Sequence, residues 1–240
     1  MIPSSPRRTW TFLLLSSLVF FAPDLLAPNS LGQDPTYLML YSLYQGALLL
    51  ALFWFGPPLC RAMVMREVDG GPGHETVALS LATLRNAPFR LPGLPVTLAE
   101  HPAPFIVTAG LLPGHSQVFL SSAMVARLGP LGLRFLLARA LAHGGLAQRL
   151  AAFLPVLVLT VLWPDNYADP RTWLMLAAFF AAWLALHWSF ELRADRLAAL
   201  AMGPAALPGL GELQAAGIGA LGSLSLQPPL RWRLRVVAAG

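Results

Sequence analysis

The stretch of sequence that decides the fold reads TWLMLAAFFAAWLALHWSFELRADR and runs from Thr172 to Arg196. No charged side chain occurs between Thr172 and Phe190, and a helix needs about 20 predominantly apolar residues to cross a bilayer. Residues 191–196, ELRADR, follow without a break. The pattern therefore predicts a transmembrane helix whose end leads directly into a group of charged residues.

The whole chain is more apolar than a typical soluble domain. Of its 240 residues, 56% are hydrophobic and 11% are charged, and the mean hydropathy is +0.62. In a soluble domain roughly a quarter of the residues are charged. The lipid bilayer is therefore the first partner that the composition predicts.

The basic charge of the chain does not indicate nucleic-acid binding. The formal net charge is +5, the pI is about 10.3, and all 16 basic residues are arginines. The arginines are scattered or lie beside apolar segments, and they form no stripe with interleaved aromatic residues. We therefore expect no nucleic acid as a partner. The single cysteine, Cys60, excludes an internal disulfide and a multi-cysteine metal site.

Three further apolar segments bring the predicted number of transmembrane helices to about four. Tyr37 to Cys60 has no charge over its whole length. Thr9 to Leu26 is interrupted by Pro23, and a signal peptide is the alternative for it. Leu150 to Trp163 is short and contains Pro155, so a buried or re-entrant helix is its alternative.

Arginines at the ends of these segments predict their orientation, because basic residues near the ends of spans stay on the cytoplasmic side. They precede the first segment and follow the second and the fourth, at Arg7, Arg8, Arg61, Arg66, Arg193 and Arg196. These three ends are then cytoplasmic, in what we expect to be a bacterial-type inner membrane.

The more polar sequence falls into two pieces that would meet in one split cytoplasmic domain. We expect residues 1–60 to form two N-terminal transmembrane segments and residues 150–190 a hydrophobic hairpin. Residues 61–149 and 191–240 would then be the two parts of the domain. Spacing and Pro or Gly punctuation predict its helices and strands, with helices at 75–86 and 131–143 and strands at 96–99, 105–108 and 117–120.

Three sequence features follow one another in an order that can be compared with known membrane proteins. Glu191 and Asp195 form an E-x-x-A-D-R pattern directly after a span, the helix Leu133–His143 precedes the hairpin, and Gln227-Pro228-Pro229 comes near the end. This order resembles the HtpX and CAAX-prenyl-protease group of membrane zinc peptidases, from about residue 37 onward. In that family the last segment reads His-Pro-Pro. The resemblance implies a mainly α membrane protein with a small split α+β, zincin-like cytoplasmic domain.

The motif that carries catalysis in that family is degenerate here. H-E-x-x-H places two zinc-binding histidines one helical turn apart, and its glutamate polarises the attacking water. The matching residues are Arg139-Ala140-Leu141-Ala142-His143. Arg139 has no lone pair to offer a metal, and Ala140 cannot act as a base, a loss of roughly 10²–10⁴-fold in rate. We therefore expect no ordinary metalloprotease catalysis.

Two ligand positions of the family remain, His143 and Glu191, and Asp195 matches the carboxylate that orients a ligand histidine. His187 lies one turn before Glu191 on the same helix face, so it is an alternative third ligand. A partial zinc site is one interpretation, although we expect no cofactor. The other interpretation is structural, with His187 bonded to a neighbour and His143 packed at its helix end.

Arg139 suggests a different way to balance charge at this site. If the fold is kept, its guanidinium lies within reach of Glu191, and a guanidinium matches a carboxylate in a two-pronged way. The sequence therefore predicts an ion pair in place of the metal. The alternative is that Arg139 points into solvent.

Two functions follow from the resemblance. The first is a non-catalytic homologue that binds or regulates membrane-protein or unfolded polypeptide segments, held along an edge strand at Gln117 to Leu120. The second is an active zinc metalloendopeptidase with a rearranged metal site and a distant base, Glu100 or Glu212. Similarity to the antibiotic-sensor membrane peptidases is a looser third possibility, because the predicted hairpin favours the HtpX type.

Overall fold

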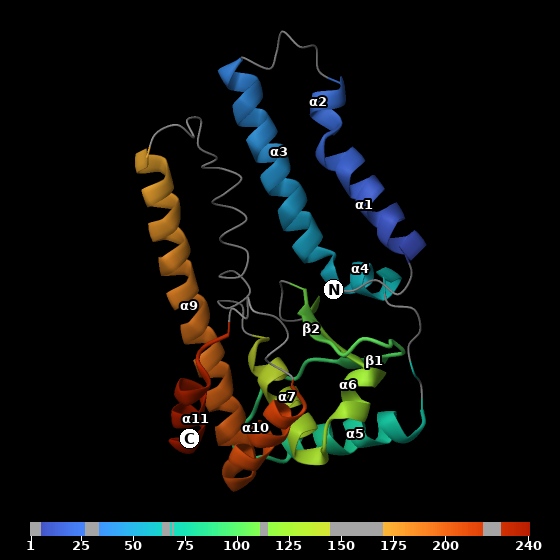
Figure 1. The fold of residues 1–240 in the computed structure, drawn as a ribbon. Helices are drawn as coiled ribbons and strands as arrows, with labels where there is room; N and C mark the ends of the chain where they lie inside the picture. Colours follow the sequence, from blue (N-terminus) through green and yellow to red (C-terminus); the bar gives the residue numbers. More distant parts are fainter. Residues whose placement is uncertain are drawn as a thin grey trace.

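The computed structural model describes residues 6–26, 34–63, 68, 70–110, 115–144, 170–217 and 227–240. It is mostly helical and contains a small three-stranded sheet (Figure 1). The prediction of a mainly α chain with a small α+β part is therefore confirmed. Long apolar helices extend upward in Figure 1 from a lower part that contains the sheet and the shorter helices.

Two long N-terminal helices lie side by side. They are α1 (Pro6–Phe20) and α3 (Pro35–Trp54), and the Tyr44 hydroxyl on α3 donates to the Val19 carbonyl of α1 at 2.5 Å. After α1 the helix is interrupted by a turn at Phe21. The short helix α2 (Ala22–Leu26) follows and has Pro23 in its first turn. Asp34 caps the start of α3, because its carboxylate accepts a hydrogen bond from the Thr36 N–H at 2.7 Å.

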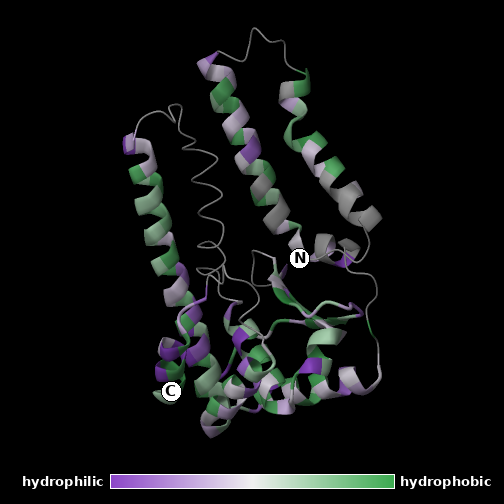
Figure 2. Cartoon of the chain, in the orientation of Figure 1, coloured by the Kyte–Doolittle hydropathy of each residue, from purple (hydrophilic) through white to green (hydrophobic). Residues whose placement is uncertain are grey.

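The longest helix, α9, runs from Pro170 to Met202. Within the described ranges it is the one helix long and apolar enough to cross a membrane. Its first part is mostly exposed and apolar (Figure 2), whereas its end is buried against other helices. The predicted segment Leu150 to Trp163 lies outside the described residues. The arrangement with four transmembrane helices and the division into domains stay predictions.

The sheet consists of β1 (Val96–Ala99), β2 (Ile106–Ala109) and β3 (Gln117–Ser121). All three strands lie within one residue of their predicted positions, because Pro and Gly mark their ends. The strand order is β1-β3-β2, with β3 parallel to β1 and antiparallel to β2. Every residue of β3 is buried, as suits a central strand.

The prediction that Gln117 to Leu120 is an edge strand is therefore wrong. Both sides of β3 are already hydrogen-bonded to neighbouring strands, so it has no free edge for a polypeptide. On the outer side of β1, the Val68 N–H donates to the Leu98 carbonyl at 2.9 Å. The other edge of the sheet belongs to β2.

Helix α7 (Pro130–Ala142) lies within one residue of the predicted range 131–143, whereas α4 (Gly56–Met63) contacts α3 and β2. Ser121 caps the short helix α6 (Ser122–Arg127), because its hydroxyl accepts from the Met124 N–H at 3.1 Å. The helices that pack against α7 are α5 (Pro72–Arg85), the end of α9 and α10 (Ala206–Ala215). Around these lie α6, a 3-10 turn (Gly203–Ala205) and α11 (Leu230–Ala238).

The apolar core centres on α7. Leu133, Phe135 and Leu137 are fully enclosed between α5, α9 and α10. Gly209 lets α10 approach α7 closely, because a Cβ added there would lie 2.8 Å from the Leu131 carbonyl oxygen. Burial of α7 on all sides holds the residues near its C-terminal end in fixed positions.

Candidate functional site

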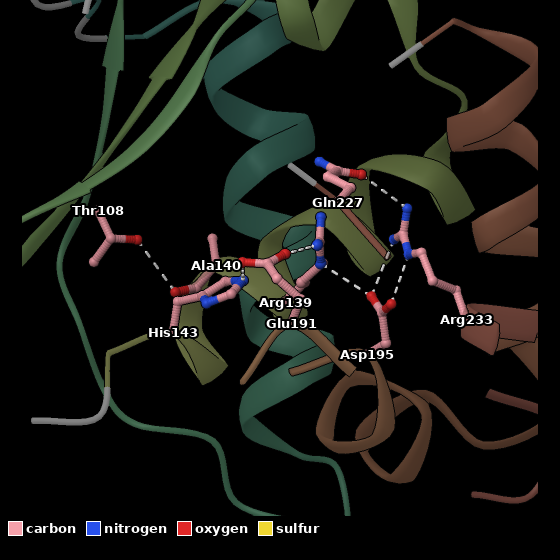
Figure 3. Close-up of polar contacts among 8 residues, drawn as sticks. All are labelled: Thr108, Arg139, Ala140, His143, Glu191, Asp195, Gln227 and Arg233. Atoms are coloured by element: carbon pink, nitrogen blue, oxygen red, sulfur yellow. Dashed lines mark hydrogen bonds and ion pairs between the residues drawn. The ribbon is translucent and has the colours of Figure 1, made fainter. Parts of the chain in front are cut away.

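Two helices bring the residues of the predicted site together. Arg139 and His143 lie one turn apart at the end of α7, and Glu191 and Asp195 lie one turn apart on α9. Side chains spaced by four residues project from the same face of a helix. Because α7 packs against α9, the basic pair and the acidic pair face each other (Figure 3).

Arg139 forms the predicted ion pair with Glu191. Its Nη2 donates a hydrogen bond to Glu191 Oε2. Only 8% of the arginine side chain and 12% of the glutamate side chain are exposed, so Arg139 does not point into solvent. The prediction of a charge pair between these two positions is confirmed.

Asp195 lies between two arginines and is fully enclosed. Arg139 Nε lies 3.0 Å from its Oδ1 without an aligned hydrogen bond, so this contact is electrostatic. Arg233 of α11 makes the stronger contact: its Nε donates to Oδ2 at 2.6 Å and its Nη2 to Oδ1 at 3.0 Å. Such a two-pronged pair fixes the orientation of both groups.

Arg233 is a site residue that the sequence interpretation missed. It is one of three arginines at alternate positions, with Arg231 and Arg235, and charge alone does not separate them. The available signal was helical spacing, because Arg233 and Val237 are one turn apart and together form the buried face of α11.

Gln227 reaches the site through Arg233. Its Oε1 accepts from Arg233 Nη1 at 3.1 Å. The segment that resembles His-Pro-Pro is thus attached to the same group of charges as the motif helix (Figure 3). An amide oxygen that accepts from an arginine completes a hydrogen-bond network.

The four buried charges balance one another. Arg139 and Arg233 supply two cations, and Glu191 and Asp195 supply two anions, all shielded from solvent. Taking isolated charges out of water costs several kcal/mol each, roughly, and mutual pairing offsets that cost. The group therefore reaches neutrality from its own side chains.

His143 adjoins this group as a neutral imidazole. Its Nε2 lies 3.5 Å from Glu191 Oε1, too far for a normal hydrogen bond. Burial lowers the pKa of His143 to about 4; Glu191 opposes this change and Arg139 adds to it. At neutral pH the ring therefore carries no charge.

Ala140 and His187 occupy the other two predicted positions of the site. Ala140 has only a methyl side chain, and its carbonyl accepts from the Thr108 hydroxyl of β2 at 3.3 Å. The imidazole of His187 stacks on the Trp183 ring, with centroids 5.4 Å apart. Across the described ranges, no group of three or more His, Cys, Asp or Glu side chains is arranged to hold a metal ion.

The side chains present do not fit a zinc centre. A tetrahedral catalytic site needs three protein ligands and one open position. The Arg139 guanidinium lies against Glu191, one of the two ligand positions that the resemblance implies. The other is His143, whose Nε2 lies 3.5 Å from Glu191 Oε1. A cation bonded to the ligand carboxylate opposes zinc by charge and by position.

Glu212 is bound at the opposite end of α7 from His143. Glu212 of α10 accepts from the Gly132 N–H at 2.7 Å, in the first turn of α7. That turn lies roughly 16 Å from His143 at 1.5 Å of rise per residue. Glu100 lies exposed just after β1. Glu212 satisfies a backbone donor at the helix start, where a negative charge is also favourable.

Searches with this chain found no matching protein-family model and no matching curated protein sequence.

Proposed function

We propose that this chain is a membrane-embedded homologue of the HtpX and CAAX-prenyl-protease peptidases that binds or regulates other polypeptides without hydrolysing them. The observation that carries the proposal is the ion pair between Arg139 and Glu191. In this pair the carboxylate that would bind zinc in that family is bound instead by an arginine of the same chain. Ala140 leaves the attacking water without a base at the neighbouring position.

The proposed placement is in an inner membrane, with the split domain on the cytoplasmic side. Support comes from α9, whose uncharged part from Thr172 to Phe190 is about 28 Å long, close to the thickness of the hydrocarbon layer. Trp173 and Trp188 lie near its two ends, as is typical of residues at membrane interfaces. Two N-terminal spans and a hairpin complete the proposed set of four.

In this proposal a polypeptide binds along β2, because β3 is the central strand and Val68 already bonds to the outer side of β1. Thr108 of β2 contacts Ala140 of the motif helix, so a segment added to this edge would run close to the charge group. Main-chain hydrogen bonds at a sheet edge bind extended segments with little dependence on sequence. No metal is needed for that interaction.

The test uses the full chain in detergent with a reduced, unfolded model polypeptide. A photo-reactive residue in place of Val107 on β2 should cross-link to the polypeptide, and mass spectrometry should find the polypeptide uncut. A photo-reactive residue in place of Thr83, exposed on α5, is the matched control and should not cross-link. Cleavage that depends on Glu191 would favour the enzyme interpretation, and equal cross-linking at both positions would refute binding at β2.

A further inference from the structure

The outward side of α11 carries two arginines between apolar borders. Arg231 and Arg235 are one helical turn apart and both are exposed. At 3.6 residues per turn, the apolar side chains fall on either side of the arginines, with Leu230 and Leu234 on one border and Trp232 and Val236 on the other. Leu230 is 42% exposed, Trp232 38% and Leu234 40%, so this side of the helix is not part of the core.

The orientation of α11 is fixed by its opposite side. Arg233 is held on Asp195 of α9, and Val237 is buried beside it in the helix register. Near the end of the chain, a Cβ added to Gly240 would lie 3.1 Å from the Cβ of Ala199. The helix therefore runs along α9 and cannot turn its arginines inward without breaking the pair with Asp195.

The start of α11 lies at the point where α9 would leave the membrane. The Trp232 ring meets the Trp188 ring edge-on, with centroids 5.6 Å apart. In the proposed membrane placement, on which this inference rests, the hydrocarbon layer ends near Phe190. The contact with Trp188 then places the first turn of α11 at this boundary, next to the headgroup layer that is roughly 5–7 Å thick.

We propose that this surface binds anionic phospholipid headgroups. We call it the α11 collar, formed by Leu230, Arg231, Trp232, Leu234 and Arg235. Like charges one turn apart repel each other, and in the described part of the chain neither Arg231 nor Arg235 has an acidic partner. A phosphate between them removes that repulsion.

The apolar borders favour a lipid over an acidic protein as the occupant. Leucine and tryptophan beside arginines on one helix are typical of segments that enter the headgroup and acyl boundary. The contact between Trp232 and Trp188 also makes this border continuous with the apolar surface of α9. A lipid tail can thus lie on α9 while its headgroup meets the arginines.

The experiment titrates the full chain, purified in a neutral detergent, with short-chain phosphatidylglycerol or phosphatidylcholine and counts bound lipids by native mass spectrometry. We expect tighter binding of phosphatidylglycerol. The double variant Arg231→Gln/Arg235→Gln should lose about fivefold in that preference for each arginine removed, since each contributes about 1 kcal/mol near an anionic surface. Arg231→Lys/Arg235→Lys should keep it, because charge is what the headgroup requires.

The matched control is Arg85→Gln/Arg127→Gln, which removes two exposed arginines from α5 and α6 and should leave the preference unchanged. Equal binding of both lipids by the wild type, or an undiminished preference in the α11 variant, would overturn the proposal. Neither of these two results would affect the proposed membrane placement, for which we expect that the protein needs detergent for extraction from membranes. A chain that stays in aqueous buffer without detergent would instead refute the membrane placement itself.

Discussion

Arg139 of α7 and Glu191 of α9 form a buried ion pair that joins the degenerate motif helix to the longest helix of the chain. Neither group can recover its hydration in the folded state, so each is stable only while the other is present. The pair therefore ties the stability of the fold to the contact between these two helices.

Replacement of Arg139 should destabilise the protein strongly. In Arg139→Ala, Glu191 loses its partner and Asp195 loses one of two neighbouring cations. Removal of one member of a buried pair costs about 3–5 kcal/mol, so we expect a clear fall in Tm in detergent.

The double variant Arg139→Met/Glu191→Leu provides the control for this prediction. It removes both charges together and should be more stable than Arg139→Ala, because no unpaired carboxylate is left at position 191. An unchanged Tm in Arg139→Ala would show that the pair does not stabilise the fold.

Replacement of Arg233 should be as damaging as replacement of Arg139, although the two arginines lie on different helices. Arg233→Ala leaves the fully buried Asp195 without its two-pronged partner, at a cost of about 3–5 kcal/mol. Arg231→Ala, two residues away and exposed, should change the free energy of unfolding by less than about 0.5 kcal/mol. Equal Tm values for both variants would contradict the proposed role of Arg233.

Stability should fall as the solution becomes acidic, through His143. Its pKa is lowered by burial from 6.5 in the unfolded chain to about 4 in the fold, so the unfolded state takes up a proton first as the pH drops. The contribution is complete above about pH 6.5 and is lost as the pH falls toward 4, up to roughly 3 kcal/mol.

The measurement is the Tm of the wild type and of His143→Gln between about pH 8 and pH 4. Glu191 and Asp195 remain in both proteins, so the difference between the two curves isolates the imidazole. The difference should shrink below about pH 6.5, and two parallel curves would mean that His143 is not held neutral by burial.

Gly209 should tolerate no larger side chain. In Gly209→Ala the new methyl would meet the Leu131 carbonyl and the Phe135 side chain, and overpacking of this kind costs about 1–3 kcal/mol. Gly211→Ala is the matched control on the same helix, because nothing lies within 4 Å of an added Cβ there. The control should be neutral or stabilised by up to about 1 kcal/mol from helix propensity, and a similar gain at Gly209 would contradict the close approach of α10 to α7.

The secondary structure was largely predictable because local rules govern it. Proline and glycine bound the three strands, Ser121 caps α6, and Pro130 suits the first turn of α7. The Arg139–Glu191 pair was also predictable, because the resemblance implies that these two positions lie close together and they carry opposite charges. What local rules do not contain is strand order, so the central position of β3 was missed.

The rest of the site could not be read from the sequence for a similar reason. Arg233 is identical in type to its exposed neighbours Arg231 and Arg235, and only the packing of α11 on α9 selects it as the partner of Asp195. Glu212 looked available as a base, but its place in the fold is at the opposite end of α7. In both cases the deciding contact joins residues that are far apart along the chain.

Zinc content tests most directly the proposal that Arg139 stands in place of a metal. The full chain is purified in detergent and analysed for zinc beside Arg139→His/Ala140→Glu, which restores the family motif, and beside Glu191→Ala. We predict far less than one zinc per wild-type chain and close to one per chain in the restored variant. Close to one zinc per wild-type chain, lost in Glu191→Ala, would contradict the proposal that the ion pair stands where the metal would be.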